Sequence, residues 1–573
     1  MNKEISNQEI AQVFAEIADI LELKQDNPFK IRAYRKAVQL IEHLEKPLSQ
    51  VEDLQKLPGI GKELAEKIRT LLEGKPLPAL EKLRKEVEPG LLELLKIRGL
   101  GPRRIKTLNQ KLGIKDIESL RSALEEKPDL IIKLPGFGKK LVEDLKQSLK
   151  EFQEYSQRHR LDLAKKQADE LVEYLKTAKG VEQIEVAGSL RRRKETIGDI
   201  DILITGKNSQ AVMEKFVSYP RVREVLAKGE TKSSVVLDSG IQVDVRFFSP
   251  ESFGAGLCYF TGSKAHNIAV RTIAKQMGLK ISEYGVFKGE KRIAGKTEEE
   301  VYKSLGLVWI PPELREDRGE IQLAREGRLP KLVELKDIKA DLHIHSRWSD
   351  GRHTIEEVAE RAKELGYKYI AITDHSKSQH QARGLDEKRL LEEFKEIDQL
   401  NQTIKGIKIL KGVELDILKD GSLDLEPEVL KKADLVIGAI HSNFNLSKAE
   451  QTKRLIQALD TGLIHILAHP TSRLIGEREP IELDWEKLVP VLVKRKVAVE
   501  INASPHRLDA SGELAKYLKE RGIKFALGTD AHILGSLSEM EYGVYTARRG
   551  WLEAKDILNT LPLNQFLKWL KTR

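Results

Sequence analysis

The chain contains the run Gly188-Ser189-Leu190-Arg191-Arg192-Arg193 and, shortly after it, Gly198-Asp199-Ile200-Asp201-Ile202-Leu203-Ile204. Residues i and i+2 of a strand share one face, so Asp199 and Asp201 are expected to point together while the isoleucines are buried on the other side. A third acid, Asp244, stands inside the strand-like run Gln242-Val243-Asp244-Val245-Arg246. The pattern predicts a mixed sheet with three carboxylates on one face.

Three clustered carboxylates are the ligands that hard divalent cations prefer, and Mg²⁺ keeps phosphate oxygens and waters as its other ligands. Two such ions about 3.5–4 Å apart activate a 3′-hydroxyl and neutralise a leaving pyrophosphate. Ser189 and Arg192 are candidates for holding the triphosphate. An Asp-x-Asp pair alone is more often solvent-facing alternation, but the Gly-Ser start, the spacing and the distant Asp244 argue jointly for a nucleotidyl-transfer site with two Mg²⁺ (or Mn²⁺) ions.

On the N-terminal side, residues 1 to about 155 show apolar positions at helical spacing, interrupted by Gly and Pro. Three similar elements lie between the predicted helices, and any one of them reads equally well as an ordinary helix turn. Each second glycine is followed by a basic residue and a helix start, which suits a DNA phosphate without reading bases. The DNA-binding candidates are Gly59, Gly61 and Lys62 (first copy), Gly99, Gly101 and Arg103 (second, which begins at Arg98), and Gly136, Gly138 and Lys139 (third).

On the C-terminal side, a charge-rich stretch after Pro311-Pro312 reads as a linker, and beyond it seven short apolar runs each precede a helical pattern. Such units imply a parallel barrel or an open parallel sheet whose catalytic groups lie at the strand C-terminal ends. Only His43, His159 and His266 of the 13 histidines precede residue 338. Nine residues at the predicted strand ends are candidate metal ligands: His343, His345, Asp350, His375, Glu414, His441, His469, Asp530 and His532.

Mixed histidine and carboxylate ligands suit Zn²⁺, Mn²⁺ or Fe²⁺ better than Mg²⁺. Any single histidine is more often a hydrogen-bonded structural residue, but nine candidates at strand ends make that reading improbable for the set. A multinuclear site bridged by Glu414 and Asp530 would generate hydroxide near neutral pH and clamp a phosphate. The sequence therefore predicts a second, separate metal site for phosphoester hydrolysis.

Residues 1 to about 310 resemble the family X DNA polymerases, which are related to DNA polymerase beta. The match includes Gly188-Ser189 through Asp201, Asp244, and the run Tyr259-Phe260-Thr261-Gly262-Ser263 with Asn267 and Arg271. The resemblance implies catalytic roles for Asp199, Asp201 and Asp244. It implies nucleotide binding by Gly188, Ser189, Arg192, Tyr259, Phe260, Gly262, Ser263, Asn267 and Arg271, with Asn267 at the nascent base pair and Arg271 at the template strand.

The same resemblance places Lys67 where relatives carry a Schiff-base lysine, which implies an AP-site or deoxyribose-phosphate lyase activity. A lysine nucleophile must be deprotonated, so its pKa has to be lowered by burial or by neighbouring cations. Glu63 stands where such relatives carry another lysine, and Lys264 stands where some carry an acid near the incoming base. On the residues alone, Lys67 is a solvated member of a Glu-Lys-rich helix.

Residues 338–573 resemble the polymerase and histidinol phosphatase (PHP) domain, in which the nine positions form a three-metal centre. The fusion resembles the bacterial family X DNA polymerases (PolX), which implies a 3′-5′ exonuclease as the second activity. We expect a multidomain fold: an all-α helix-hairpin-helix region, an α/β nucleotidyltransferase palm with a thumb, and a distorted (β/α)7 barrel of PHP type. The expected domains are 1–84 (lyase-like), 85–155 (helical, DNA-binding), 156–248 (palm), 249–315 (thumb), 316–337 (linker) and 338–573 (PHP).

The function expected from these features is template-directed filling of short gaps in DNA repair, with metal-dependent trimming of 3′ ends. Two alternatives remain: a polymerase fused to a small-molecule phosphatase, and a DNA-binding repair scaffold with reduced catalysis. The expected cofactors are two Mg²⁺ (or Mn²⁺) ions in the palm and up to three Zn²⁺, Mn²⁺ or Fe²⁺ ions in the PHP site. The expected partners are gapped or nicked double-stranded DNA and deoxynucleoside triphosphates (dNTPs).

Composition sets wider limits. At 573 residues the chain exceeds the size of one hydrophobic core, so several domains are expected. Its 98 Lys and Arg residues against 89 Asp and Glu give a net charge of +9, which permits nucleic-acid binding. The single cysteine, Cys258, excludes an internal disulfide framework and a Cys-rich zinc module. No apolar run is long enough to cross a bilayer, so we expect a cytoplasmic monomer without membrane contact.

Overall fold

The computed structural model describes residues 7–24, 26–42, 48, 51, 53–73, 75, 77–95, 97, 99–155 and 158–572. Arg98, part of the second predicted turn, lies outside these residues. The chain divides into two compact units, Met1–Gln157 and Arg158–Arg573. No helix within the described residues is long and apolar enough to cross a membrane.

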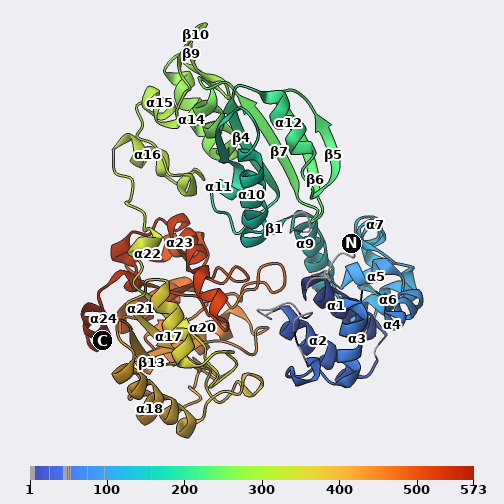
Figure 1. Cartoon of the computed structure of the whole chain (residues 1–573). Helices are drawn as coiled ribbons and strands as arrows, with labels where there is room; N and C mark the ends of the chain where they lie inside the picture. The colour runs from blue at the N-terminus through green and yellow to red at the C-terminus, as the bar shows by residue number, and fades with distance from the viewer. Residues whose placement is uncertain are drawn as a thin grey trace. The chain divides into compact units, whose positions relative to one another are not determined.

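The described part of the N-terminal unit is helical, as Figure 1 shows in blue. Its apolar side chains form two clusters, one including Phe14 and Tyr34 and the other including Phe137. Helical spacing of apolar residues puts one stripe of each helix into these clusters. The helices are α1 (Asn7–Leu23), α2 (Pro28–Glu42), α3 (Lys62–Leu72), α4 (Pro78–Glu86), α5 (Pro89–Leu94), α6 (Pro102–Leu112), α7 (Ile117–Glu126), α8 (Pro128–Ile132) and α9 (Lys139–Tyr155), with the 3₁₀ turn η2 (Leu54–Lys56) before α3.

A five-stranded sheet begins the C-terminal unit, in the order β2-β4-β7-β6-β5. Its strands are β2 (Val181–Val186), β4 (Asp199–Gly206), β5 (Val222–Lys228), β6 (Lys232–Leu237) and β7 (Gln242–Phe248). β4 and β7 are parallel, and the other neighbours are antiparallel. The buried face of β4 packs in one cluster with the helices α10 (Leu161–Lys176) and α12 (Ser209–Val217), so the opposite face is left for the acidic side chains. The two-residue strands β1 (His159–Arg160) and β3 (Thr196–Ile197) pair beside it.

The next segment consists of three helices and a small sheet. They are α13 (Phe253–Thr261), α14 (Lys264–Gln276), α15 (Glu298–Ser304) and the strands β8 (Lys280–Ser282), β9 (Gly285–Lys288) and β10 (Lys291–Ala294). α13 contacts β4, and α11 (Gly188–Arg191) contacts both α13 and β4. Helix α11, which follows β2, therefore lies next to α13, which contains Tyr259 and Phe260.

Residues 316–337, expected as a linker, bury charged side chains. The segment contains α16 (Glu320–Arg325) and η4 (Leu335–Asp337), after η3 (Pro312–Leu314). Glu320 is fully buried and lies 2.7 Å from Nδ1 of His266, while Arg315, just before the segment, is fully buried in an ion pair with Glu298. Charge-rich composition alone suggests a solvated linker, but the partners of these charges come from α14 and α15.

The last segment is a seven-stranded parallel barrel in which the strand order follows the chain, β11 to β17. Ile344 at the end of β11 bridges Ala531 after β17, which brings the first and last strands together. The expected fold class is thus confirmed. The strands are β11 (Ala340–Ile344), β12 (Tyr369–Ile372), β13 (Lys408–Asp416), β14 (Leu435–Ala439), β15 (Ile466–Leu467), β16 (Ala498–Asn502) and β17 (Phe525–Gly528).

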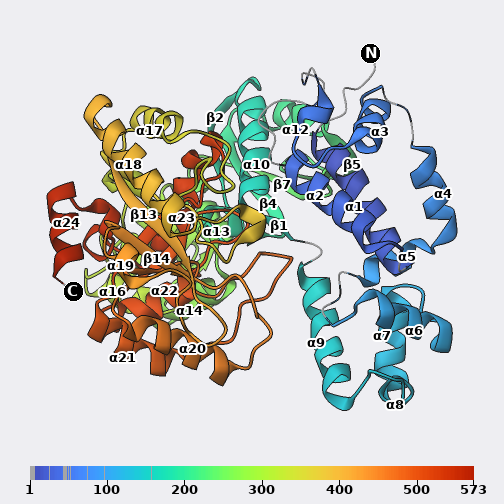
Figure 2. The ribbon, with the colours of Figure 1, turned by 90° about the horizontal axis from the view of Figure 1, so that it is seen from below.

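The barrel has separate inner and outer cores. Small and apolar side chains of the strands fill the interior, where Phe566 and Leu570 of the C-terminal helix pack against them. The larger outer cluster is formed by side chains of the strands and of the helices around them, and Figure 2 shows the ribbons of these helices around the barrel. These helices are α17 (Ile355–Glu364), α18 (Glu387–Thr403), α19 (Pro427–Leu430), α20 (Lys448–Asp460), α21 (Trp485–Arg495), α22 (Gly512–Lys519) and α23 (Met540–Arg549). The C-terminal helix of the inner cluster is α24 (Leu563–Lys571), and the short 3₁₀ turns are η5 (His380–Ala382), η6 (Leu534–Glu539), η7 (Ala554–Asp556) and η8 (Leu558–Thr560).

Candidate active sites

The three predicted turns of the N-terminal unit have the same geometry. Gly59, Gly99 and Gly136 take positive φ angles of 83°, 87° and 81°, which an L side chain rarely adopts. The carbonyl oxygen of each second glycine then accepts the first hydrogen bond of the following helix, at 3.0–3.1 Å, so α3, α6 and α9 all begin at the same point of the turn. Equal backbone geometry in three copies is more than an ordinary turn requires.

The second glycines of these turns have open space beside them. A Cβ added at Gly61, Gly101 or Gly138 would meet nothing within 4 Å, and these residues are exposed. Internal packing therefore does not explain glycine at these three positions. Lys62, Arg103 and Lys139 are exposed at the same helix starts. Free helix N–H groups beside a cation form a site for an anion such as a DNA phosphate.

The three aspartates of the five-stranded sheet lie together on its open face. Asp201 and Asp244 are directly opposite each other on the parallel strands β4 and β7, and Asp199 lies one alternation away. Burial, together with Asp199 and Asp244, raises the pKa of Asp201 to about 7. A cation bound beside Asp201 would favour its ionised form near neutral pH.

Asp244 differs from the other two aspartates in its partners. Its carboxylate accepts hydrogen bonds from Gln242 Nε2 at 3.0 Å and from Arg246 Nη2 at 3.2 Å. Burial raises the pKa of Asp244, but hydrogen bonds and the nearby Lys232 ammonium outweigh it and lower the pKa overall. This carboxylate therefore stays ionised without a metal.

Gly188 lets the backbone of α11 approach the acids. Its φ is +63°, and a Cβ there would lie 2.6 Å from Oδ2 of Asp201. The residue at this position must be glycine for two independent reasons, conformation and contact. Ser189 follows immediately, so the first turn of α11 faces the carboxylates.

A cavity of about 700 Å³ opens in front of Asp199 and Asp201. It is lined by eight of the nine predicted nucleotide-binding residues: Gly188, Ser189, Arg192, Tyr259, Phe260, Gly262, Asn267 and Arg271. The ninth, Ser263, caps α14 instead, where its side chain accepts a hydrogen bond from the His266 backbone at 3.2 Å. Arg158, Lys194 and Lys264 also line the cavity, and their positive charges add to that of Arg192.

Tyr259 and Phe260 form the aromatic side of the cavity, and polar groups contact Tyr259 there. Asn267 Nδ2 donates to the carbonyl oxygen of Tyr259 at 2.7 Å, and the Arg271 guanidinium lies 5.0 Å from the Tyr259 ring centre. Arg192 donates to the carbonyl oxygen of Thr261, next to Gly262. A Cβ on Gly262 would come within 3.2 Å of Arg192, so the turn after α13 and this arginine depend on each other.

All nine predicted ligands of the barrel meet at the C-terminal ends of the strands. They fall into four overlapping groups whose ligand atoms lie within 4.8 Å of one another: His345, Asp350, His375 and His532; His343, His469 and Asp530; His343, His345 and Glu414; and His375, Glu414 and His441. Glu414 is central, because His469 Nε2 lies 2.9 Å and His441 Nε2 3.2 Å from its Oε1, and His375 Nδ1 lies 2.8 Å from its Oε2.

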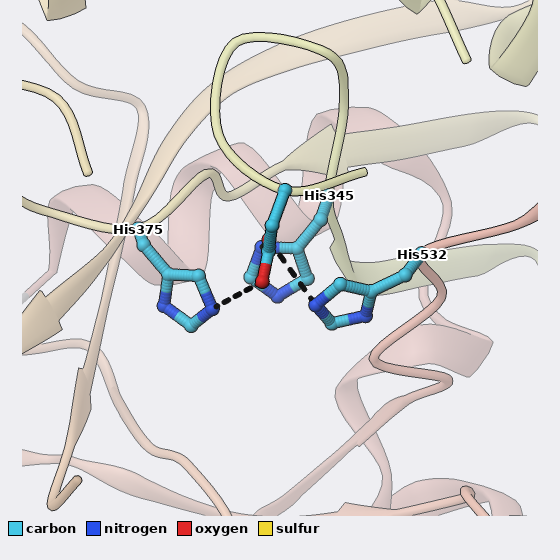
Figure 3. Close-up of side chains that lie close together, drawn as sticks. His345, His375 and His532 are labelled. Carbon is cyan, nitrogen blue, oxygen red and sulfur yellow. Dashed lines mark ion pairs between the residues drawn. The ribbon is translucent and has the colours of Figure 1, made fainter. Parts of the chain in front are cut away.

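Several nitrogen and oxygen atoms of this cluster lie close to one another without hydrogen-bond geometry. Nε2 of His343 and of His345, Nδ1 of His375 and Oε2 of Glu414 are buried without a hydrogen bond. Figure 3 shows the imidazoles of His345, His375 and His532 converging, with dashed ion pairs between them and the acid they surround. Burial, with His532 and His375 next, lowers the pKa of His345 to about 4 and keeps it a neutral ligand. Buried nitrogen and oxygen atoms that converge without hydrogen-bonding one another fit metal ions.

Two acids behind the cluster orient its imidazoles. Nδ1 of His343 lies 2.6 Å from Oε1 of Glu500, and Nδ1 of His441 lies 2.6 Å from Oδ1 of Asp416. Such carboxylates set the tautomer, and here they leave Nε2 of each imidazole facing Glu414. Sequence reasoning missed both. The sequence signal for Glu500 was an acid inside the apolar run 497–501. The signal for Asp416 was a second acid two residues after Glu414 in the same strand.

Lys67 lies in α3, half-buried against Tyr34. Its Nζ hydrogen-bonds to the Tyr34 hydroxyl at 2.6 Å and forms an ion pair with Glu63. Burial lowers the pKa of Lys67, but the bonds to Glu63 and Tyr34 outweigh it, so the pKa is raised overall. The ammonium form is therefore favoured, which is the opposite of what a Schiff-base nucleophile requires.

The fold and the two sites define a class: a nucleotidyltransferase of the polymerase beta type joined to a PHP domain. The family models that match are those described as helix-hairpin-helix domain (residues 5–77), SAM-like helix-hairpin-helix tandem (91–151), DNA polymerase beta palm (160–274), DNA polymerase beta thumb (256–316) and PHP domain (341–504). Together they cover the three aspartates of the five-stranded sheet and seven of the nine barrel residues, while Asp530 and His532 lie beyond residue 504.

Among characterised relatives, the DNA polymerase/3′-5′ exonuclease PolX of Bacillus subtilis (strain 168) is 42% identical over 568 residues, which cover 98% of this chain and 99% of that protein. The chain belongs to the PolX family of DNA polymerase/3′-5′ exonucleases. A probable phosphatase of Thermoanaerobacter sp. (strain X514) is 31% identical over 244 residues, 41% of this chain and 94% of that protein. Family membership implies binding to DNA and dependence on divalent metal ions.

Proposed function

We propose that this chain fills short gaps in double-stranded DNA and trims 3′ ends at a second site. The observation that carries the first activity is the convergence of Asp199, Asp201 and Asp244 on one face of the sheet, where Asp199 and Asp201 line the cavity of about 700 Å³. A deoxynucleoside triphosphate is the substrate that matches a pocket with acids at one end and Arg158, Arg192 and Lys194 around it.

The three aspartates would hold two Mg²⁺ (or Mn²⁺) ions. Bound there, such ions supply Lewis-acid activation of the primer 3′-hydroxyl and charge neutralisation on the triphosphate. Gly188 leaves room at Asp201, and Ser189 and Arg192 bind the phosphates. The base and sugar then lie toward the aromatic side of the cavity.

On that aromatic side, Tyr259, Phe260 and the turn at Gly262 pack on the sugar and favour deoxynucleotides. Asn267 contacts the nascent base pair and Arg271 the template strand. Ser263 acts by capping α14, which holds Asn267 and Arg271 in place. Binding of the triphosphate breaks no internal bond of Asn267, since only one of its amide hydrogens is used on Tyr259.

A direct test uses a 5′-labelled primer on a one-nucleotide gap, with one dNTP at a time and Mg²⁺. We expect extension by one nucleotide only with the complementary dNTP. Extension that ignores the template base would contradict the proposal. Sedimentation of the active species on gapped or nicked duplex tests the further proposal that the chain works as a monomer.

For the barrel, we propose 3′-5′ exonuclease activity from the nine-residue cluster with up to three Zn²⁺, Mn²⁺ or Fe²⁺ ions. Bound metal would supply a hydroxide near neutral pH. The protein's own contribution is to keep His345 and His469 neutral and to orient His343 and His441 through Glu500 and Asp416. A second candidate is a small-molecule phosphatase, since the similar probable phosphatase matches 244 residues of this chain, which is close to the length of the segment 338–573. Hydrolysis of p-nitrophenyl phosphate faster than of a DNA 3′ end would favour it.

The helix-hairpin turns are proposed to bind the DNA backbone. Replacing Lys62, Arg103 and Lys139 by alanine is expected to weaken binding to gapped duplex and to lower the slope of log Kd against log salt concentration by about 1 per residue. Fluorescence anisotropy across a salt series measures both. As a control, alanine at the exposed Lys82, Lys115 and Lys127 removes equal charge outside the turns. Equal loss of slope in the two triple variants would argue against the turns as the binding site.

We also propose that lyase activity at Lys67 is weak because Glu63 holds the ammonium form. Glu63→Gln is expected to lower the Lys67 pKa and to raise borohydride trapping on abasic-site DNA about tenfold at neutral pH. Trapping yield on a denaturing gel is the measurement. The double variant Glu63→Gln with Lys67→Ala should trap nothing. Trapping that persists in the double variant would assign the nucleophile to another amine.

A further inference from the structure

One side chain of the PHP barrel contacts a residue that lines the polymerase cavity, Arg192. Arg549, the last residue of α23, is only 5% exposed although it carries a full charge. Its Nη1 donates to the carbonyl oxygen of Arg192 at 2.9 Å and lies 3.2 Å from Oε1 of Glu316. Its Nη2 lies 3.4 Å from Oε1 of Glu513.

Glu316 is shared between the two domains. Its Oε1 also accepts a hydrogen bond from Nε of Arg192 at 3.0 Å. Arg192 and Arg549 therefore contact the same carboxylate oxygen, one from the cavity side and one from the barrel side. One carboxylate carries a single negative charge and therefore neutralises one cation. The interaction of Glu316 with Arg549 accordingly weakens its interaction with Arg192.

The sharing has a consequence for the triphosphate. Arg192 lines the cavity and donates to Thr261 O as well as to Glu316. If Arg549 were absent, Glu316 would pair with Arg192 alone, and the attraction of Arg192 for an incoming anion would fall. The carbonyl oxygen of Arg192 would also lose the donor that fixes the backbone of this turn.

The spacing of the helices supports a dedicated contact. α22 begins at Gly512, where a Cβ would lie 2.8 Å from the Cβ of Arg549, so glycine allows α23 to bring Arg549 this close. The carbonyl oxygen of Arg549 in turn accepts a bond from Arg318 Nη2 at 2.9 Å. Both ends of the residue are thus held.

We propose that Arg549 of the PHP domain is a positioning residue for dNTP binding, which acts by neutralising Glu316 and fixing Arg192. The inference rests on the proposed polymerase function. It makes the barrel part of the polymerase site, independently of the metal chemistry of the barrel.

The test is single-nucleotide gap filling at saturating gapped DNA, with the complementary dNTP titrated. Arg549→Met is expected to raise the KM for dNTP about 10-fold with kcat changed far less, because binding of the charged triphosphate is weakened and the reacting carboxylates are not touched. Arg549→Lys keeps the charge but not both contacts, so an intermediate KM is expected. Thermal unfolding confirms that each variant is folded at the assay temperature.

Two further variants separate this role from general domain docking. Arg548→Met removes the neighbouring arginine, which also ties the domains together, through Glu313 at 2.7 Å and the carbonyl oxygen of Val333 at 3.0 Å, but does not touch Arg192 or Glu316. Its KM should stay near the wild-type value. Arg549→Met combined with Glu316→Gln should recover most of the lost affinity, since the competing charge is gone.

The inference is overturned if the KM of Arg549→Met equals that of the wild type, if Arg548→Met raises it equally, or if the Glu316→Gln double variant stays as weak as Arg549→Met. A wild-type protein that fails to add the templated nucleotide in the same assay would instead overturn the proposed polymerase function. The two failures are therefore distinguishable.

Discussion

Replacing Asp199 and Asp201 together by alanine is expected to abolish nucleotide addition on one-nucleotide gapped DNA while Mn²⁺-dependent 3′-end hydrolysis remains. The reason is that the pair forms one side of the carboxylate cluster opposite Asp244, and among the described residues no other acid lines the cavity. Loss of the metal site removes several kcal/mol of transition-state stabilisation, so the rate should fall about 1,000-fold or more. Single-turnover primer extension measures the loss.

Asp238→Ala is a matched control for this variant. Asp238 follows β6 of the same sheet but forms a surface ion pair with Arg221, at 3.1 Å. Exposed pairs contribute little, so this variant should keep gap filling within about twofold of wild type. If the double aspartate variant, still folded and DNA-bound, lost hydrolysis as well, the two sites would not be independent.

Replacing His343 and His345 together by alanine should have the opposite effect: 3′-end hydrolysis falls about 1,000-fold or more and gap filling is retained. His343 belongs to two of the overlapping ligand groups and His345 to two, so every group except that of His375, Glu414 and His441 loses a donor. Metal analysis of the purified variant should show reduced content. Exonuclease assays on a 3′-labelled duplex measure the activity.

His380→Ala provides the matched control, because this histidine lies exposed in the turn η5 of the same barrel, outside the nine-residue cluster. Hydrolysis and metal content should match the wild type. Retained hydrolysis in the His343 and His345 double variant would move the nuclease activity away from the cluster. Loss of gap filling in that variant would show that the barrel metals, and not only Arg549, support the polymerase site.

Much of the fold follows from local patterns. The Asp199-Ile200-Asp201-Ile202 alternation predicts a strand with an acidic and an apolar face, and β4 has both. Seven apolar runs predict seven parallel strands because each is followed by a helical pattern. The ends of parallel strands share one face, so the convergence of the histidines follows from their place in the sequence. The three Gly-x-Gly sequences, each followed by a basic residue, predict three similar turns, because a positive φ angle is a local requirement that glycine satisfies.

Other features depend on residues that are distant in the chain. The charge run after Pro312 suggests a solvated linker, yet Arg315 and Glu320 are buried because Glu298 and His266 lie opposite them. Lys67 looks like a candidate nucleophile until its contacts with Glu63 and Tyr34 set its pKa. Glu500 and Asp416 are acids in apolar strands, but their role in orienting His343 and His441 follows only from the contacts in the folded barrel.

Hydrophobic periodicity, turn residues and the types of neighbouring side chains can be read along the sequence. By themselves they predict where the strands and helices of this protein begin and which groups are able to bind metal. The charge state of a side chain and its interaction partners depend on which residues surround it in the folded protein. The sharing of Glu316 between Arg192 and Arg549, 357 residues apart, arises when two domains pack and exclude water from an ion network, and no pattern along the chain encodes that distance.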